Sequence, residues 1–292
     1  MKKSFQKLLF SLIGLIFCFG ASAQKSKTAN SLLWKITKKD NKEASYLFGT
    51  IHVICSQDYF WTSKMQQAMD ATSQLCLEMN MSDPNLMSNA GMMLFDLSGT
   101  TLRDYFSNEA DYQAVAHFIE DSLGQNLEIA SRMKPVALYL MYTMGLAQGP
   151  CQETVSYEMK LVEKAAEQKD EVKGLETLAE QMEVLESIPT DSIIQQMIRI
   201  AKGEEENTDE LKELMSAYKK QDLNTLNKLM SDMGSEGGMD GKKLIDDRNK
   251  KWIPAMQKMM QEKPTFFGVG AGHVPGLLTL LKAEGYTVQP VQ

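Results

Sequence analysis

The stretch Phe267-Gly268-Val269-Gly270-Ala271-Gly272-His273-Val274 decides the fold, because it has a counterpart near the beginning of the chain. That counterpart is Tyr46-Leu47-Phe48-Gly49-Thr50-Ile51-His52-Val53, so both stretches are an apolar segment followed by Gly-x-x-His-Val. The chain has only 3 histidines, and two of them, His52 and His273, lie in these stretches. We interpret the two stretches as a weak internal repeat in which each apolar segment is a β-strand.

The segments around the repeat predict α/β structure at both ends of the chain. Short apolar or alternating runs predict strands at Leu32–Lys38, Ser45–Phe48, Leu75–Met79, Pro264–Gly268 and Tyr286–Val291. Helical spacing predicts helices at Ser63–Ser73 and Pro275–Glu284. Because the first helix lies between two strands, we expect a βαβ unit with parallel strands.

The region from about residue 83 to residue 263 is predicted to be a long, mainly helical insertion. Helices are expected at Ala110–Leu123, Pro135–Ala147, Ser156–Gln168, Leu175–Ile188, Asp191–Ala201, Asp209–Lys219, Leu223–Met230 and Lys242–Glu262. Pro254 is expected to kink or break the last of these, and Gly234–Gly241 to form a loop. The predicted fold is therefore α/β, with a mixed or parallel central sheet from the two ends of the chain.

The repeat also predicts where chemistry takes place. Ligands of parallel sheets bind beyond the carboxyl ends of the strands, where Gly49 and Gly270 would let a substrate approach the backbone. His52 and His273 would then face one crevice, as general base or metal ligands. The alternative is that both rings only hydrogen-bond their own loops. His117 follows no glycine turn and is expected to be a helix residue without chemistry.

An acidic partner is expected at Glu78, which follows the apolar run Leu75-Cys76-Leu77. A carboxylate there needs a partner, and with His52 and His273 it makes a two-histidine, one-carboxylate set suited to a divalent metal. The alternative is a carboxylate that caps or pairs with nearby backbone. Arg248 and Asn249 form the next candidate, although their pattern alone favours a solvated helix face.

The first 23 residues read as a secretory signal. Lysines precede the 13-residue apolar run Leu8–Gly20, which is shorter than the about 20 residues that span a bilayer. Small residues at Ala21 and Ala23 predict cleavage after Ala23 and export to the periplasm or the medium, leaving residues 24–292 as one domain without a membrane span. The bulky Phe17 argues against a lipoprotein at Cys18.

Composition excludes several other classes of protein. A net charge of −7 argues against nucleic-acid binding, and the P-loop, dinucleotide, His-Glu-x-x-His and Gly-x-Ser-x-Gly patterns do not occur. The 21 methionines favour core filling over a copper site. Cys55, Cys76 and Cys151 leave two possibilities open: one disulfide with a leftover thiol, or three buried thiols, which we favour.

The chain resembles the TraB/GumN family, relatives of the Tiki metalloproteases, over almost all of its length after the leader. The two Gly-x-x-His blocks carry the resemblance, together with Leu77–Met79, Gly174–Thr177 with Gln181, and Asp247–Asn249 with Trp252. The resemblance implies a fold similar to the erythromycin-esterase and ChaN type. It also implies a metal-dependent site at His52, Glu78 and His273, supported by Arg248 and Asn249.

The sequence therefore supports three hypotheses about function. The leading hypothesis is an exported metal-dependent hydrolase of peptides, in which Mn²⁺ or Co²⁺ at His52, Glu78 and His273 activates water. Arg248 or Asn249 would then steady the oxyanion. The second is an esterase-like hydrolase without metal, in which a histidine is the general base. The third is a protein that binds haem or another small ligand without turnover.

Overall fold

The computed structural model describes residues 30–39, 41, 43–148, 151–204, 208–236 and 241–291. The predicted leader, residues 1–23, lies outside the described residues, and so do residues 237–240 of the predicted glycine-rich loop. The part of that loop at Gly234–Glu236 belongs instead to the end of a helix.

Within the described residues, the central sheet has six strands in the order β6-β4-β7-β2-β1-β8. The strands are β1 (Leu33–Thr37), β2 (Ser45–Thr50), β4 (Gln74–Leu77), β6 (Glu171–Gly174), β7 (Phe266–Gly270) and β8 (Thr287–Pro290). The four strands from β6 to β2 run parallel, while β1 is antiparallel to both β2 and β8. The mixed sheet is confirmed, and the C-terminal strand β7 lies between the two strands of the predicted βαβ unit.

Two pieces of β structure lie in the region predicted to be mainly helical. Strand β6 pairs with β4 at the edge of the central sheet. It was not predicted because it contains the polar residues Glu171 and Lys173 and therefore lacks the apolar run of a buried strand. Strands β3 (Ile54–Cys55) and β5 (Thr154–Val155) form a separate two-stranded ladder. The helix expected to start at Leu175 begins later, at Leu178, because β6 and a tight connection come first.

The other predicted helices are present with small shifts of their ends, except that Ala110–Leu123 and Lys242–Glu262 are each divided between an α-helix and a π-helical turn. Two further helices, at Leu86–Met93 and Leu127–Ala130, were not predicted. The α-helices are α1 (Ser63–Asp70), α2 (Leu86–Met93), α3 (Glu109–His117), α4 (Leu127–Ala130), α5 (Pro135–Gln148), α6 (Tyr157–Gln168), α7 (Leu178–Glu186), α8 (Thr190–Ala201), α9 (Thr208–Lys219), α10 (Leu223–Glu236), α11 (Arg248–Glu262) and α12 (Val274–Ala283). Helix α11 continues through Pro254, so the proline does not end it.

Shorter helical turns connect these elements. The 3₁₀ turns are η1 (Ser56–Asp58), η2 (Leu102–Tyr105) and η5 (Ala271–His273). The turns η3 (Phe118–Ser122) and η4 (Lys242–Asp247) have π-helical geometry. The second of these leads directly into α11.

Helices cover both faces of the sheet. On β2, the ring of Phe48 lies 5.4 Å from that of Tyr157 on α6. A Cβ on the next residue, Gly49, would lie 3.1 Å from Val274 on α12. Because successive strand residues point to opposite faces, α6 and α12 lie on opposite sides of the sheet. The result is a helix–sheet–helix sandwich.

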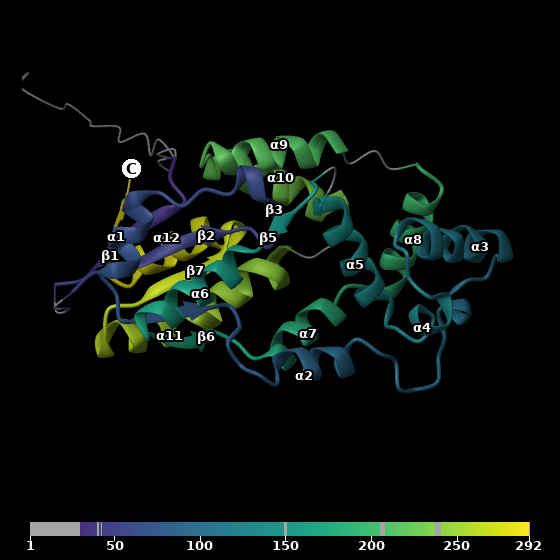
Figure 1. Cartoon of the computed structure of the whole chain (residues 1–292), viewed down its shortest axis with the longest axis horizontal. Helices are drawn as coiled ribbons and strands as arrows, with labels where there is room; N and C mark the ends of the chain where they lie inside the picture. Colours follow the sequence, from purple (N-terminus) through teal and green to yellow (C-terminus); the bar gives the residue numbers. More distant parts are fainter. Residues whose placement is uncertain are drawn as a thin grey trace, which may run out of the picture.

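The described residues form two hydrophobic cores. The main core joins the sheet to its covering helices and includes Met65, Met69, Met256 and Met260, as expected for core filling. The second core lies within the helical insertion, where α3, α5 and α8 pack together. Figure 1 shows α3, α4 and α8 at the far end of the molecule from the sheet. Among the described helices, none is both long and apolar enough to cross a membrane.

Candidate functional site

The two Gly-x-x-His stretches meet at one edge of the sheet. Strands β2 and β7 are parallel neighbours, and Thr50 pairs with Gly270 at their carboxyl ends. Strand β4 flanks β7 on the other side and ends at Leu77, so Glu78 emerges at the same edge. The backbone N–H of Gly270 donates to Glu78 Oε1 at 2.8 Å. The structure therefore places His52, Glu78 and His273 at one edge of the sheet.

His273 is a buried and neutral side chain. Only 4% of it is exposed, and its ring lies 4.5 Å from that of Trp252. The side-chain amide of Asn249 donates from Nδ2 to the backbone carbonyl of His273. This orientation of the amide places Asn249 Oδ1 2.8 Å from His273 Nδ1. Nδ1 therefore carries the proton and Nε2 is the acceptor. Burial lowers the pKa of His273 to about 4, so the imidazole is uncharged at neutral pH.

Asn249 reaches His273 because Gly276 leaves room for it. Asn249 lies on α11 and is almost fully buried, and Gly276 lies in the first turn of α12. A Cβ on Gly276 would lie 2.4 Å from Asn249 Nδ2, closer than any real contact allows. Gly276 is thus required for the approach of the two helices, and Asn249 acts by orienting His273.

Arg248 connects the groups at this edge. Its Nε and Nη2 donate to the two carboxylate oxygens of Glu176, at 3.2 and 2.6 Å. Nη2 also donates to Glu78 Oε2 at 2.5 Å, while Nη1 reaches the Leu244 carbonyl and His273 Nε2, each at 3.1 Å. A guanidinium has five N–H groups, and all five have acceptors here. No N–H of Arg248 is left for an oxyanion, so in this arrangement it holds the other side chains in place.

Glu176 is a member of this cluster that the motif analysis did not select. Its side chain is 2% exposed, and Oε2 also accepts from Trp252 Nε1 at 3.2 Å. The pairing of β4 and β6 continues one step further, since Glu176 N donates to the Glu78 carbonyl at 2.9 Å. This pairing brings the two carboxylates together. A signal was present, because Glu176 lies within the stretch Gly174–Thr177 that carries the family resemblance.

Glu78 is a charged and nearly buried carboxylate. Burial acts to raise its pKa, but His273, the Arg248 guanidinium, His52 and the Gly270 N–H together outweigh burial, and the pKa lies below its usual value. Its oxygens are occupied by Gly270 and Arg248. This matches the alternative in which the carboxylate pairs with its surroundings.

The predicted metal ligands do not fit one divalent ion in this arrangement. His273 Nε2 lies 3.8 Å from Glu78 Oε1, but the Arg248 guanidinium bonds to both side chains and supplies the positive charge between them. Among the described residues, no three His, Cys, Asp or Glu side chains gather closely enough to bind a metal. A metal would have to displace Arg248 from His273.

His52 lies at the same edge in a different environment. Its side chain is 70% exposed, and Nδ1 lies 3.0 Å from Oε1 of Glu158, at the start of α6. Glu158 is nearly buried and also accepts from the hydroxyls of Thr50 at 2.6 Å and Ser156 at 2.8 Å. The structure thus adds a carboxylate that sequence reasoning missed, because an acidic residue after an N-terminal serine is typical of ordinary helix capping.

The pair His52–Glu158 is charged. The hydrogen bond that His52 donates to Glu158, together with the charge of Glu158, raises the pKa of His52 to about 9 against the opposing effect of desolvation. Burial acts to raise the pKa of Glu158, but its bonds to His52 and Thr50 lower it to about 2. In the part of the chain that the structure describes, no hydrogen bond or ion pair joins His52 to Glu78 or His273, although the charge of Glu78 still acts on its pKa.

The remaining predicted residues lie as follows. Gly49 is buried on β2, where its carbonyl accepts from the Tyr218 hydroxyl at 3.0 Å, and Gly270 is half-buried with its N–H on Glu78. Their expected contact with substrate stays a prediction. His117 is the last residue of α3 and pairs with Asp121 at 2.8 Å, so it is a helix residue outside this edge.

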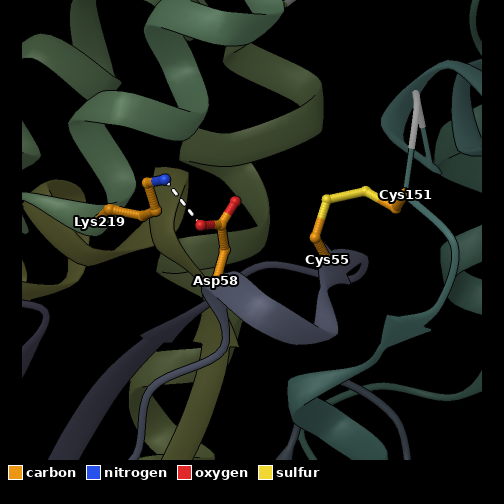
Figure 2. The surroundings of a disulfide bond; sticks show 4 residues. All are labelled: Cys55, Asp58, Cys151 and Lys219. Atoms are coloured by element: carbon orange, nitrogen blue, oxygen red, sulfur yellow. Dashed lines mark hydrogen bonds and ion pairs between the residues drawn. A yellow bond between two sulfur atoms is a disulfide. The ribbon is translucent and has the colours of Figure 1, made fainter.

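The cysteines correct the interpretation that we favoured. Cys55 and Cys151 form a disulfide with a Cα–Cα distance of 5.5 Å, and Cys76 is a free, buried thiol on β4. Figure 2 shows this disulfide beside the η1 turn, with the ion pair of Asp58 and Lys219 on the other side of that turn. Three buried thiols are therefore wrong. A disulfide needs two cysteines that are close in the folded structure, and the positions of the cysteines along the sequence do not show this.

A sequence model of the TraB/PrgY/gumN family matches residues 32–290, which cover both Gly-x-x-His stretches and the helical region between them. Neither a curated protein nor a solved structure gave a match.

Proposed function

The chain belongs to the TraB/PrgY/gumN family, and we propose that it is a hydrolase in which His52, held by Glu158, transfers the proton. One observation carries the proposal: an exposed imidazole is hydrogen-bonded at 3.0 Å to a carboxylate that is itself nearly buried and held by two hydroxyls. An oriented histidine with an accessible nitrogen is the arrangement of a general base.

The geometry assigns separate tasks to the two ring nitrogens of His52. Nδ1 faces Glu158, so Nε2 is the nitrogen without a protein partner among the described residues. In its neutral form, His52 accepts a proton from water at Nε2 while the water oxygen bonds to the substrate carbonyl carbon. The protonated ring then returns the proton to the leaving oxygen or nitrogen as the carbonyl re-forms. Glu158 keeps the ring oriented and stabilises its charge.

The Arg248 cluster supports this edge from inside. Arg248 joins Glu78, Glu176 and His273, and Glu78 in turn fixes the N–H of Gly270. These bonds connect the ends of β4, β6 and β7 beside the strand that carries His52. Their role is to fix the loops rather than to react with substrate.

The substrate class, a peptide or a small ester, is tested with two probes. The wild type, His52→Ala and His117→Ala are compared on fluorescently labelled casein and on p-nitrophenyl acetate. His117→Ala is the matched control, because it removes another exposed histidine that lies away from the site. We expect His52→Ala to lose about 100-fold or more in kcat on whichever probe is hydrolysed, and His117→Ala to keep full activity.

Two results contradict the proposal. Equal activity of His52→Ala and the wild type removes the proton-transfer role. Absence of hydrolysis of either probe favours the non-enzymatic alternative, in which His52 would be an axial ligand, and haem titration would then show a Soret band that His52→Ala lacks.

Metal dependence stays a prediction, with its own test. If Mn²⁺ or Co²⁺ binds at His52, Glu78 and His273, the metal must displace the Arg248 guanidinium from His273 and Glu78. Removing the metal with a chelator should then abolish activity. Metal analysis of the wild type, His52→Ala and His273→Ala decides this point. Equal metal content in all three excludes these side chains as ligands, and activity in excess chelator supports the metal-free reaction.

Export to the periplasm or the medium is also proposed. The Cys55–Cys151 disulfide supports export, because such bonds persist in oxidising compartments. N-terminal sequencing of the protein recovered from its own cells tests it, and the expected first residue is Gln24. A chain that retains residues 1–23 in the cytoplasm contradicts export.

A further inference from the structure

We propose that the Cys55–Cys151 disulfide is a positioning element of the site, which holds His52 against Glu158 and releases the pair when a dithiol reduces it. The inference rests on the proposed function only for its kinetic readout. The positioning itself follows from the path of the chain around the disulfide.

The disulfide joins the two short segments that carry the pair. His52 lies three residues before Cys55, in the short connection between β2 and β3, and Glu158 lies seven residues after Cys151, in the first turn of α6. Between Cys55 and Cys151 the chain passes through α1, β4 and much of the helical insertion, a separation of 96 residues. The disulfide therefore closes a long loop directly beside the ion pair.

Several non-covalent contacts also join these two segments: Thr50 donates to Glu158 at 2.6 Å, and the fully buried Tyr157 packs against Phe48 and Tyr59. These contacts fix Glu158, whereas the end of the loop beyond His52 is held by the β3–β5 ladder.

Ile54 pairs with Val155 and Cys55 with Thr154 in the β3–β5 ladder, and Ser56 N donates to the Glu153 carbonyl at 3.0 Å. A two-residue ladder contributes little stability by itself, although Ile54 also packs in the main core. The disulfide is the covalent bond across this ladder, and the ladder holds the far end of the loop that presents His52 to Glu158.

The other tether of the same turn faces a different element. Lys219 on α9 donates to Asp58 at 2.8 Å, and Figure 2 shows this ion pair and the disulfide on opposite sides of η1. The pair is partly exposed, so solvent screens it. It also holds η1 toward α9 rather than toward α6. A variant without this ion pair therefore shows what a general loosening of η1 does, and it can be compared with the effect of breaking the disulfide.

Reduction is an ordinary thiol–disulfide exchange. A thiolate of the dithiol attacks one sulfur of the Cys55–Cys151 bond and forms a mixed disulfide, and the other sulfur leaves as a thiolate. The second thiol of the reductant then displaces the remaining cysteine. Two electrons pass to the protein, which gains two thiols, and the reductant becomes a disulfide. Both cysteines are half-buried, so a small dithiol can reach them, whereas Cys76 is fully buried.

The test is a spectroscopic comparison of oxidised and reduced chain at one pH. The imidazole Nδ1 shift of His52 is recorded by ¹H–¹⁵N NMR before and after dithiothreitol, with His52→Ala for assignment and His117 as the internal reference. Alkylation and peptide mass confirm that Cys55 and Cys151 are reduced. We expect the His52 signal to move toward that of a free imidazole, while His117 does not change.

Kinetics and matched variants complete the experiment. We expect reduction to lower kcat by about tenfold or more, with KM changed by less than about twofold, since positioning affects the reacting groups. Asp58→Asn should respond to dithiothreitol as the wild type does. The Cys55→Ser/Cys151→Ser variant should start in the reduced state and not respond. If this variant does not fold, reduction of the folded wild type still decides.

An unchanged His52 signal in the fully reduced chain overturns the inference. A signal that moves equally in oxidised Asp58→Asn also overturns it, because any loosening of η1 would then suffice. A shift on reduction in a chain without hydrolytic activity supports the positioning role while it contradicts the proposed function.

Discussion

Arg248 and Glu176 form a two-point ion pair, with Nε 3.2 Å from Oε2 and Nη2 2.6 Å from Oε1. The same guanidinium reaches Glu78 and His273, so one side chain joins the helix α11 to the ends of three strands. Pairs of this kind are valuable mainly because losing one partner leaves a buried charge alone.

Replacing Arg248 should therefore destabilise the protein strongly. Arg248→Met leaves Glu78 and Glu176 without their cation, and we expect a loss of about 3–5 kcal/mol in the free energy of unfolding. Arg248→Lys should recover only part of the loss, since an ammonium cannot supply the two-point geometry. Urea denaturation measures both.

The matched control for this prediction is Arg132→Met. Arg132 is largely exposed and lies 3.8 Å from Glu128, so its loss should change the free energy of unfolding by less than about 1 kcal/mol. If Arg248→Met is as stable as Arg132→Met, the buried ion cluster does not hold this edge together.

Two helical glycines should respond to alanine with opposite signs. A Cβ on Gly276 would lie 2.4 Å from Asn249 Nδ2, so Gly276→Ala should cost about 1–3 kcal/mol and disturb the amide that orients His273. A Cβ on Gly91 in α2 would meet nothing within 4 Å, so Gly91→Ala should gain about 0.5–1 kcal/mol. Thermal unfolding of both variants measures the difference, and equal signs contradict the packing of α11 on α12.

The two site histidines should titrate on opposite sides of neutrality. NMR titration is expected to give a pKa of about 9 for His52, paired with Glu158, and about 4 for buried His273. Both values near the ordinary 6.5 would contradict the described environments.

Stability should follow these pKa values with opposite signs. The contribution of His52 is fully present below pH 6.5 and is lost as the pH rises through 9, because only the protonated ring adds an ionic attraction to its hydrogen bond with Glu158. His273 acts in the other direction. In the unfolded chain His273 takes up a proton near pH 6.5, whereas in the native site it does so only near pH 4. The free energy of unfolding therefore falls as the pH drops through this range. Denaturation of the wild type and of His52→Ala between pH 4 and 10 measures both effects.

The sequence predicted the architecture of the site because the repeat is local. The glycine turns and the strands before His52 and His273 are visible in a few residues each, and Glu78 was placed by the apolar run Leu75-Cys76-Leu77 that comes directly before it. The sequence could not show that β7 lies between β2 and β4, because that depends on pairing between distant segments.

The partners of the site residues were harder to predict. Glu158 and Glu176 lie 106 and 98 residues beyond the strand-end residues His52 and Glu78 that they accompany. Their carboxylates look like ordinary solvated side chains along the chain. Arg248 was expected to face an oxyanion, and only the accounting of its five donors shows that it faces inward.

The most direct test of the account is the pH dependence of kcat/KM for the wild type and for Glu158→Gln. If His52 is the base, kcat/KM of the wild type rises with pH and levels off above about 9, because only the neutral ring accepts a proton. In Glu158→Gln the charge that raises this pKa is gone, so the rise should move toward pH 6.5 and the plateau should be lower. A rise at the same pH in both proteins would contradict the central role of the His52–Glu158 pair.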